Sequence, residues 1–217
     1  MTIKNPLASD VAFTPTVKAV QARKGSRSSY AMMEGNGGWE TTITPALAEF
    51  IAEQTSVFLG TANGVGQPYI QHRGGPAGFL HVIDNKTIAF ADFRGNRQFI
   101  SLGNLAENPQ AFLFLIDYAQ RRRVKIWGEA HVVEDDVDLL ANLMPKNYKA
   151  RGEYVTLFRV EAWDANCPQH IPQRIEVNDV TRMLDQRDQR IAELERELAR
   201  LAGFVAALSL GAQGPGK

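Results

Sequence analysis

The sequence predicts a mainly β (α+β) fold: six or seven antiparallel strands form a barrel, helices flank it, and a heptad-type helix follows at the C-terminus. Three observations support this prediction. Short segments between residues 56 and 163 alternate apolar and polar side chains, most are joined by short turns, and apolar residues recur every three or four positions from residue 177 onward. Parallel strands would need a helix in every crossover, so the short turns favour a closed antiparallel barrel over an open parallel sheet.

The N-terminal part of the chain contains two helix start signals. In both Thr14-Pro15 and Thr44-Pro45, a residue that can cap a helix precedes a proline at the first helical position. The first predicts a short helix that ends at Gly25. The second predicts a helix running to about Gln54, and we expect this helix to cover one end of the sheet.

The strands follow from side-chain alternation with a period of two. The segment 123–133 is the clearest, because its apolar residues share one face while Arg123, Lys125 and Trp127 share the other. The turn at 63–66 predicts a hairpin between its flanking strands, and a helix is predicted over about 136–144. The predicted strands are 56–62, 68–73, 78–83, 86–91, 111–118, 123–133 and 154–163.

The C-terminal segment has a heptad pattern. Its positions alternate three and four residues apart, and Arg187 is the only polar member; they are Val177, Val180, Leu184, Arg187, Ile191, Leu194, Leu198, Leu201, Val205 and Leu208. Such a stripe needs a partner, because an isolated helix buries too little surface to be stable. Packing on its own barrel and pairing between subunits in a coiled coil are equally compatible with the pattern.

Composition excludes several classes of function. The 217 residues carry 24 basic and 24 acidic side chains, so no global field attracts nucleic acid or an anionic membrane surface. The longest apolar run, 111–116, is far shorter than the ~18 residues of a membrane span. Cys167 is the only cysteine, and the first ten residues lack the apolar stretch of a secretory signal. We therefore expect a cytoplasmic protein with neither nucleic acid nor a membrane as partner.

The segment Arg94-Gly95-Asn96-Arg97-Gln98 follows a predicted strand and precedes a probable helix, an arrangement that suits phosphate. Free amides of a first helical turn point outward, and arginine grips phosphate with two parallel hydrogen bonds. The spacing matches neither a P-loop nor a dinucleotide fingerprint, and a solvated arginine-rich turn accounts for this segment equally well. Cys167 and His170 make only half a metal site, so no metal is predicted.

Two further segments add to this signal. Gln71-His72-Arg73-Gly74-Gly75 ends a strand with hydrogen-bonding groups and then glycines, which let a ligand approach the backbone. Arg123 and Lys125 add positive charge on a later strand. Together the segments suggest an anionic cofactor with a flat ring.

These residues resemble the pyridoxamine 5'-phosphate oxidase-like FMN-binding split barrels. The resemblance covers roughly residues 47–163, and it is carried by Gly66-Gln67-Pro68-Tyr69, Ile88-Ala89-Phe90, the Arg94 to Gln98 segment, Asn108-Pro109 and the run from Arg123 to Gly128. It implies a split β-barrel with FMN at a homodimer interface, where both subunits contribute to each site.

By position, the resemblance implies that Arg97 holds the FMN phosphate between Asn96 and Gln98, and that Asp92 borders the ring. Gln71 stands where the family has an arginine and Gln98 where it has a lysine, while Arg73 and Arg94 are placed to restore that charge. Arg123 replaces a glutamine that reaches the flavin from the other side. The implied cofactor-binding set is Gln71, His72, Arg73, Gly74, Gly75, Asp92, Arg94, Asn96, Arg97, Gln98, Arg123 and Lys125.

The chain is therefore expected to comprise an N-terminal arm (1–43), an FMN-binding split-barrel domain (44–165) and a connector with the C-terminal helix (166–217). The arginine-containing end of true pyridoxamine phosphate oxidases is missing, so vitamin B6 phosphate is not the expected substrate. The resemblance implies an FMN-dependent oxidoreductase with a small-molecule substrate or an electron donor such as NAD(P)H. The alternatives are a non-catalytic flavin-binding or interaction protein that assembles through its C-terminal helix, and a barrel that binds haem or a deazaflavin.

Overall fold

The structure, a computed structural model, describes residues 6–166 and 168–211, with side chains for 6–165 and 168–205. The chain divides into two compact units, one ending at Ile171 and the other beginning at Pro172. The elements in order are η1 (Ala8–Val11), α1 (Pro15–Lys24), α2 (Arg27–Gly35), α3 (Pro45–Glu53), β1 (Ser56–Ala62), β2 (Pro68–Gly74), β3 (His81–Val82), β4 (Thr87–Phe93), α4 (Ile100–Glu107), β5 (Gln110–Asp117), β6 (Arg122–Val133), α5 (Val137–Leu143), β7 (Gly152–Asn166) and α6 (Val177–Gly211).

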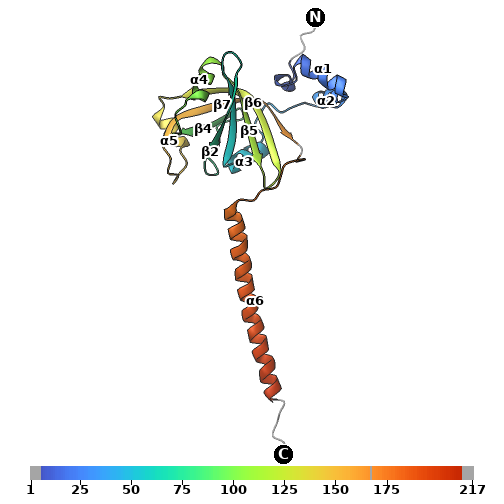
Figure 1. Cartoon of the computed structure of the whole chain (residues 1–217), viewed down its shortest axis with the longest axis vertical. Helices are drawn as coiled ribbons and strands as arrows, with labels where there is room; N and C mark the ends of the chain where they lie inside the picture. The colour runs from blue at the N-terminus through green and yellow to red at the C-terminus, as the bar shows by residue number, and fades with distance from the viewer. Residues whose placement is uncertain (1–5, 167, 212–217) are drawn as a thin grey trace, which may run out of the picture. The chain divides into compact units, whose positions relative to one another are not determined.

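The first unit is built on one seven-stranded antiparallel sheet with the order β2-β1-β5-β6-β7-β4-β3. Figure 1 shows this sheet curving back on itself. The expected mainly β architecture with flanking helices is confirmed, and it is that of a split barrel.

The expectation of a closed barrel was wrong, because β2 and β3 remain the two edges of the sheet and no ladder joins them within the described ranges. The chain after β2 bonds elsewhere. The Gly75 and Gly78 amides donate to the carbonyls of Thr55 and Ala52, at 3.1 and 2.8 Å, beside the end of α3. The strand expected at 78–83 is accordingly reduced to His81–Val82.

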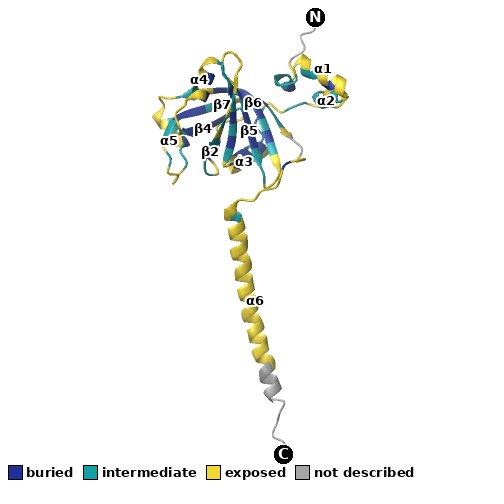
Figure 2. Cartoon of the chain, in the orientation of Figure 1, coloured by how far each residue is buried: buried dark blue, intermediate teal, exposed yellow. Residues whose placement is uncertain are grey.

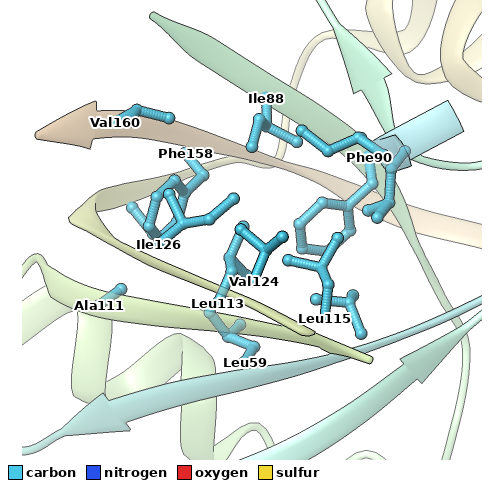
Figure 3. Packing of buried hydrophobic residues seen from close by; sticks show 14 of the residues in the cluster. Leu59, Ile88, Phe90, Ala111, Leu113, Leu115, Val124, Ile126, Phe158 and Val160 are labelled. Carbon is cyan, nitrogen blue, oxygen red and sulfur yellow. The ribbon is translucent and has the colours of Figure 1, made fainter. Parts of the chain in front are cut away.

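The core lies on the concave side of the sheet (Figure 3). Alternate residues of β1, β5 and β6 point inward, as the period-two pattern predicts, while α3 contributes Phe50 and Ile51. The largest fully buried side chains include Phe50, Phe79, Phe90, Phe158, Ile51, Leu59, Ile88, Leu113, Leu115 and Ile126. Their burial supplies the main driving force for this fold.

Two helices begin as the Thr-Pro signals predict. The hydroxyl of Thr14 accepts a hydrogen bond from the Val17 amide at 3.2 Å, and that of Thr44 accepts one from the Leu47 amide at 3.3 Å. Gly25 ends α1 in the left-handed region, with φ of 83°. Helix α4 is held against β1 by a buried hydrogen bond of 3.0 Å, which the Asn104 side-chain amide donates to the Thr61 hydroxyl.

The N-terminal arm meets the barrel through aromatic rings. Trp39 stacks on Trp127 of β6, with ring centroids 4.6 Å apart, and Phe13 packs against Trp39 at 5.0 Å. The indole of Trp163 donates to the Thr42 carbonyl at 2.8 Å. These contacts cover part of the convex side of the sheet, where Lys125 lies over both stacked indoles.

The second unit contains the single long helix α6, whose start at Val177 agrees with the predicted heptad segment. Figure 2 shows the described side chains of this helix as almost entirely exposed. None of the helices in the described ranges carries an apolar stretch able to reach across a bilayer.

Candidate functional site

Two adjoining hollows lie where β2, β4, the start of α4 and the start of β7 come together. Their volumes are about 330 and 450 Å³, open solvent included, and both are lined by Gln71, Arg73 and Asp92. The first is also lined by the loop between β4 and α4. A concave region with converging polar groups is the usual form of a small-molecule site.

At the floor of these hollows Arg73 forms an ion pair with Asp92. The Arg73 Nε and Asp92 Oδ2 atoms are 2.8 Å apart, and the two side chains are only 11% and 6% exposed. The two facing atoms are themselves buried, so each carboxylate or guanidinium charge is balanced chiefly by the other. The pair gives the hollows a charged and polar floor.

Burial dominates the electrostatics of this pair. It raises the pKa of Asp92 to about 6, although the Arg73 charge and a hydrogen bond from Tyr154 act in the opposite direction. Burial, followed by the Asp92 charge, raises the pKa of Tyr154 to about 12. Tyr154 therefore stays a neutral donor to Asp92 across the physiological range.

The raised pKa of Asp92 predicts a pH-dependent stability. Between about pH 4 and pH 6 the folded chain keeps a proton that the unfolded chain has lost, so this group's contribution to the free energy of unfolding falls as the pH rises. The total change is on the order of 3 kcal/mol. We expect the stability of Asp92→Asn relative to wild type to increase over this window in urea titrations; a constant difference would contradict the assignment.

The loop between β4 and α4 presents its polar groups toward the first hollow. Arg97 and Phe99 have φ of 59° and 55°, in the left-handed region that non-glycine residues rarely occupy. Such strain is concentrated at functional sites. Phe99 precedes α4 without a side-chain cap, so no side chain satisfies the first amides of this helix.

The two arginines of this loop share one acid. The Nε atoms of Arg94 and Arg97 lie 3.8 and 3.6 Å from the same Glu153 carboxylate oxygen, and the Arg97 guanidinium lies over the Phe99 ring at 5.3 Å. Both arginine side chains remain about half exposed, at 44% and 54%. They are therefore accessible to an anion that replaces Glu153.

Most residues proposed from the sequence converge here. Those that line the hollows are Gln71, His72, Arg73, Gly74, Asp92, Asn96, Arg97 and Gln98. Arg94 stands beside them through Glu153. His72 lies on the face of β2 opposite Gln71 and Arg73, and its ring forms a hydrogen bond of 2.8 Å with the Ser56 hydroxyl. Gly75 packs closely against Phe79, because a Cβ added at Gly75 would lie 2.7 Å from the Phe79 side chain.

Arg123 and Lys125 are not brought to this site within one chain. They pair with Asn166 and Asp164 near the end of β7, whereas Asp92 pairs with Tyr154 near its start. Ten residues of strand correspond to roughly 33 Å. Lys125 also forms an ion pair with Asp164 at 3.1 Å.

Three lining residues with polar side chains were missed from the sequence. Ser101 is buried and donates to the Gln71 side-chain carbonyl at 2.9 Å, and Glu153 and Tyr154 come from β7. Glu153 and Tyr154 reach the site because β4 pairs with β7, and the local sequence contains no signal of this pairing. Cys167, considered above as a metal ligand, lies outside the described residues.

The family model of the pyridoxamine 5'-phosphate oxidases matches residues 43–167, more than half of the 217-residue chain. The chain belongs to this family. The residues of the two hollows lie within the segment that the family model matches. No curated protein matches the chain in sequence.

Solved structures share the fold of this pyridoxamine 5'-phosphate oxidase family member. HupZ of Group A Streptococcus is 18% identical over 61% of this chain and 99% of its own, with a TM-score of 0.46. An FMN-binding protein of Syntrophomonas wolfei is 11% identical over 67% of this chain and 97% of its own (TM-score 0.43). A Clostridium acetobutylicum protein related to general stress protein 26 is 14% identical over 61% and 92% (TM-score 0.41).

Proposed function

We propose that the chain binds FMN in the two hollows and serves as an FMN-dependent oxidoreductase. One observation carries this proposal: two accessible arginines beside the uncapped start of α4 adjoin a hollow that is lined by Gln71, Arg73 and Asp92. The helix start and the two arginines suit a phosphate. The adjoining hollow with its polar side chains suits the polar edge of a flat ring.

The phosphate end of the site has the chemistry that a dianion requires. The first amides of α4 carry partial positive charge, and Arg94 and Arg97 add two guanidinium groups. Asn96 fixes the loop, because its side-chain oxygen accepts a hydrogen bond from the Gln98 amide at 3.2 Å. Glu153 is the acid in contact with these arginines, and its distances of 3.8 and 3.6 Å from them are long enough for the contacts to be exchanged.

The ring end offers both donors and acceptors. The pyrimidine edge of a flavin carries carbonyl oxygens and ring nitrogens, and Gln71, Arg73 and Asp92 supply groups of complementary type. The hydrogen bond from Ser101 orients the Gln71 amide by occupying its oxygen, which leaves the NH₂ group toward the hollow as a donor.

The proposal includes a homodimer. Arg123 and Lys125 are remote from the hollows of their own chain, so they would reach a flavin only from a second copy. This matches the shared sites of the family, and it assigns both residues to the partner's cofactor.

Bound FMN supplies hydride or single-electron transfer, and the chain binds and orients it. The substrate is a small molecule of unknown identity, and NADH or NADPH is the first electron donor to test. A non-catalytic flavin-binding role is the second candidate, favoured by the exposed apolar seam of α6 as an assembly surface.

The direct test is a titration of the purified chain with FMN, riboflavin and a deazaflavin, followed by flavin fluorescence, with mass spectrometry of any copurifying molecule. Preference for FMN is expected, and a chain that ignores all three compounds would overturn the proposal. Reduction of the bound flavin by NADH or NADPH, with reoxidation at useful rates, then separates an enzyme from a binding protein.

Glu153→Gln is expected to tighten FMN binding about two- to five-fold, because it removes the carboxylate that competes with phosphate for Arg94 and Arg97. The gain should diminish at high salt. Riboflavin, which lacks the phosphate, should bind both proteins equally. Glu49→Gln on the exposed side of α3 is the matched control, and equal gains from both variants would argue against competition at this loop.

A further inference from the structure

Helix α6 carries a continuous apolar seam whose described side chains are largely exposed. In heptad notation the a positions are Val177, Leu184, Ile191, Leu198 and Val205, and the d positions with described side chains are Val180, Arg187, Leu194 and Leu201. The apolar members are between 39% and 77% exposed. A helix of this length with such a stripe requires a covering surface.

The residue types along the seam favour two strands. Three of the five a positions are β-branched (Val177, Ile191 and Val205), and leucine occupies the d positions 194 and 201. In parallel coiled coils, β-branched residues at a with leucine at d select the dimer over higher oligomers.

The charges beside the seam favour a parallel pair in register. In that alignment a g residue faces the e residue five positions later in the other helix, which brings Arg190 opposite Glu195 of the second copy. Arg187 at d packs beside the e residue Asp188 of the second copy. An antiparallel pair instead brings e residues together and g residues together. The charged g residues, Arg190 and Glu197, have opposite signs, but both charged e residues, Asp188 and Glu195, are acidic and would repel.

We propose that α6 pairs with α6 of a second copy of this chain as a parallel, in-register, two-stranded coiled coil. Arg187 defines the register, because any shift moves it away from Asp188 of the second helix and into an apolar layer. This interface is independent of the proposed flavin site and does not require FMN.

Disulfide trapping in the full chain tests the proposal. Cys167→Ser removes the only native cysteine, and Leu184→Cys or Leu201→Cys then places one thiol at an a or a d layer. Both variants are expected to form covalent dimers rapidly under mild oxidation. Gln189→Cys, on the outward side of the same helix, is the control and should crosslink at least several-fold more slowly. Trapping at only one of the two layers, or at neither while circular dichroism reports an intact helix, would overturn the parallel pairing.

A charge exchange gives a second test that leaves the seam unchanged. Arg190→Glu and Glu195→Arg, each added singly to the Leu201→Cys chain, are expected to slow trapping several-fold, whereas the double exchange restores it. Failure of the double exchange to recover the rate would reject the alignment, since both residues lie on the exposed surface of the helix.

Discussion

Replacing Arg94 and Arg97 together by alanine is expected to weaken FMN binding by at least about 100-fold. Charge-assisted hydrogen bonds contribute roughly 1.5–3 kcal/mol each, so two arginines account for about two to four orders of magnitude. The loss of both arginines' contacts with Glu153 changes this estimate little, because partly exposed ion pairs at 3.6–3.8 Å contribute little to stability. Fluorescence titration of the apoprotein with FMN measures the effect.

Riboflavin separates the phosphate contribution from a general loss of the site. The double variant should bind riboflavin nearly as well as the wild type, and Arg200→Ala on the exposed surface of α6 should bind both ligands unchanged. Equal losses for FMN and riboflavin would place the phosphate elsewhere.

Gly128→Ala is expected to destabilise the first unit by at least about 3 kcal/mol and to lower its melting temperature by roughly 10 °C. The register of β6 and β7 shifts between Trp127 and Gly128, and this irregularity brings the Arg159 carbonyl against the glycine. An added Cβ would lie 2.0 Å from that backbone oxygen and 2.9 Å from the Phe158 ring. The backbone of a central strand cannot yield by that distance without breaking the ladder.

Gly103→Ala is the matched control. Gly103 lies within α4, and an added Cβ there meets nothing within 4 Å. Alanine is favoured over glycine inside a helix, so this variant should gain about 0.5–1 kcal/mol. Urea titration of both variants distinguishes the close approach at Gly128 from a general sensitivity to glycine replacement, and a tolerated Gly128→Ala would contradict the packing described here.

Much of the fold could be predicted because its signals are local. The alternation in β1, β5 and β6 gives their limits to within a residue or two, and Thr14 and Thr44 cap the helices that their prolines indicate. Helix α2 was missed because Ser26 makes no side-chain cap and the segment has no buried residue. An ion pair between Arg27 and Glu34 holds it instead, together with a hydrogen bond from Ser9 to Glu34.

The sequence predicted the part of the candidate site that comes from β2 and the loop between β4 and α4. Arg73 and Arg97 come from β2 and the β4–α4 loop, both of which have recognisable polar runs. Glu153 and Tyr154 belong to a strand more than fifty residues later, and only the pairing of β4 with β7 brings them to Asp92. Long-range pairing of this kind is set by the whole sheet rather than by local pattern, which also explains why β7 extends beyond both predicted ends.

The aromatic contacts of the N-terminal arm have a spectroscopic consequence. The chain has three tryptophans, and all of them lie at this junction: Trp39 and Trp127 stack face to face, while Trp163 is tied to the Thr42 carbonyl. The indole emission of the protein and the tryptophan bands of its near-ultraviolet circular dichroism therefore originate where the arm touches the sheet. Release of the arm would change these tryptophan signals while the far-ultraviolet signature of the strands persists, so the two spectral regions follow two separate parts of the molecule.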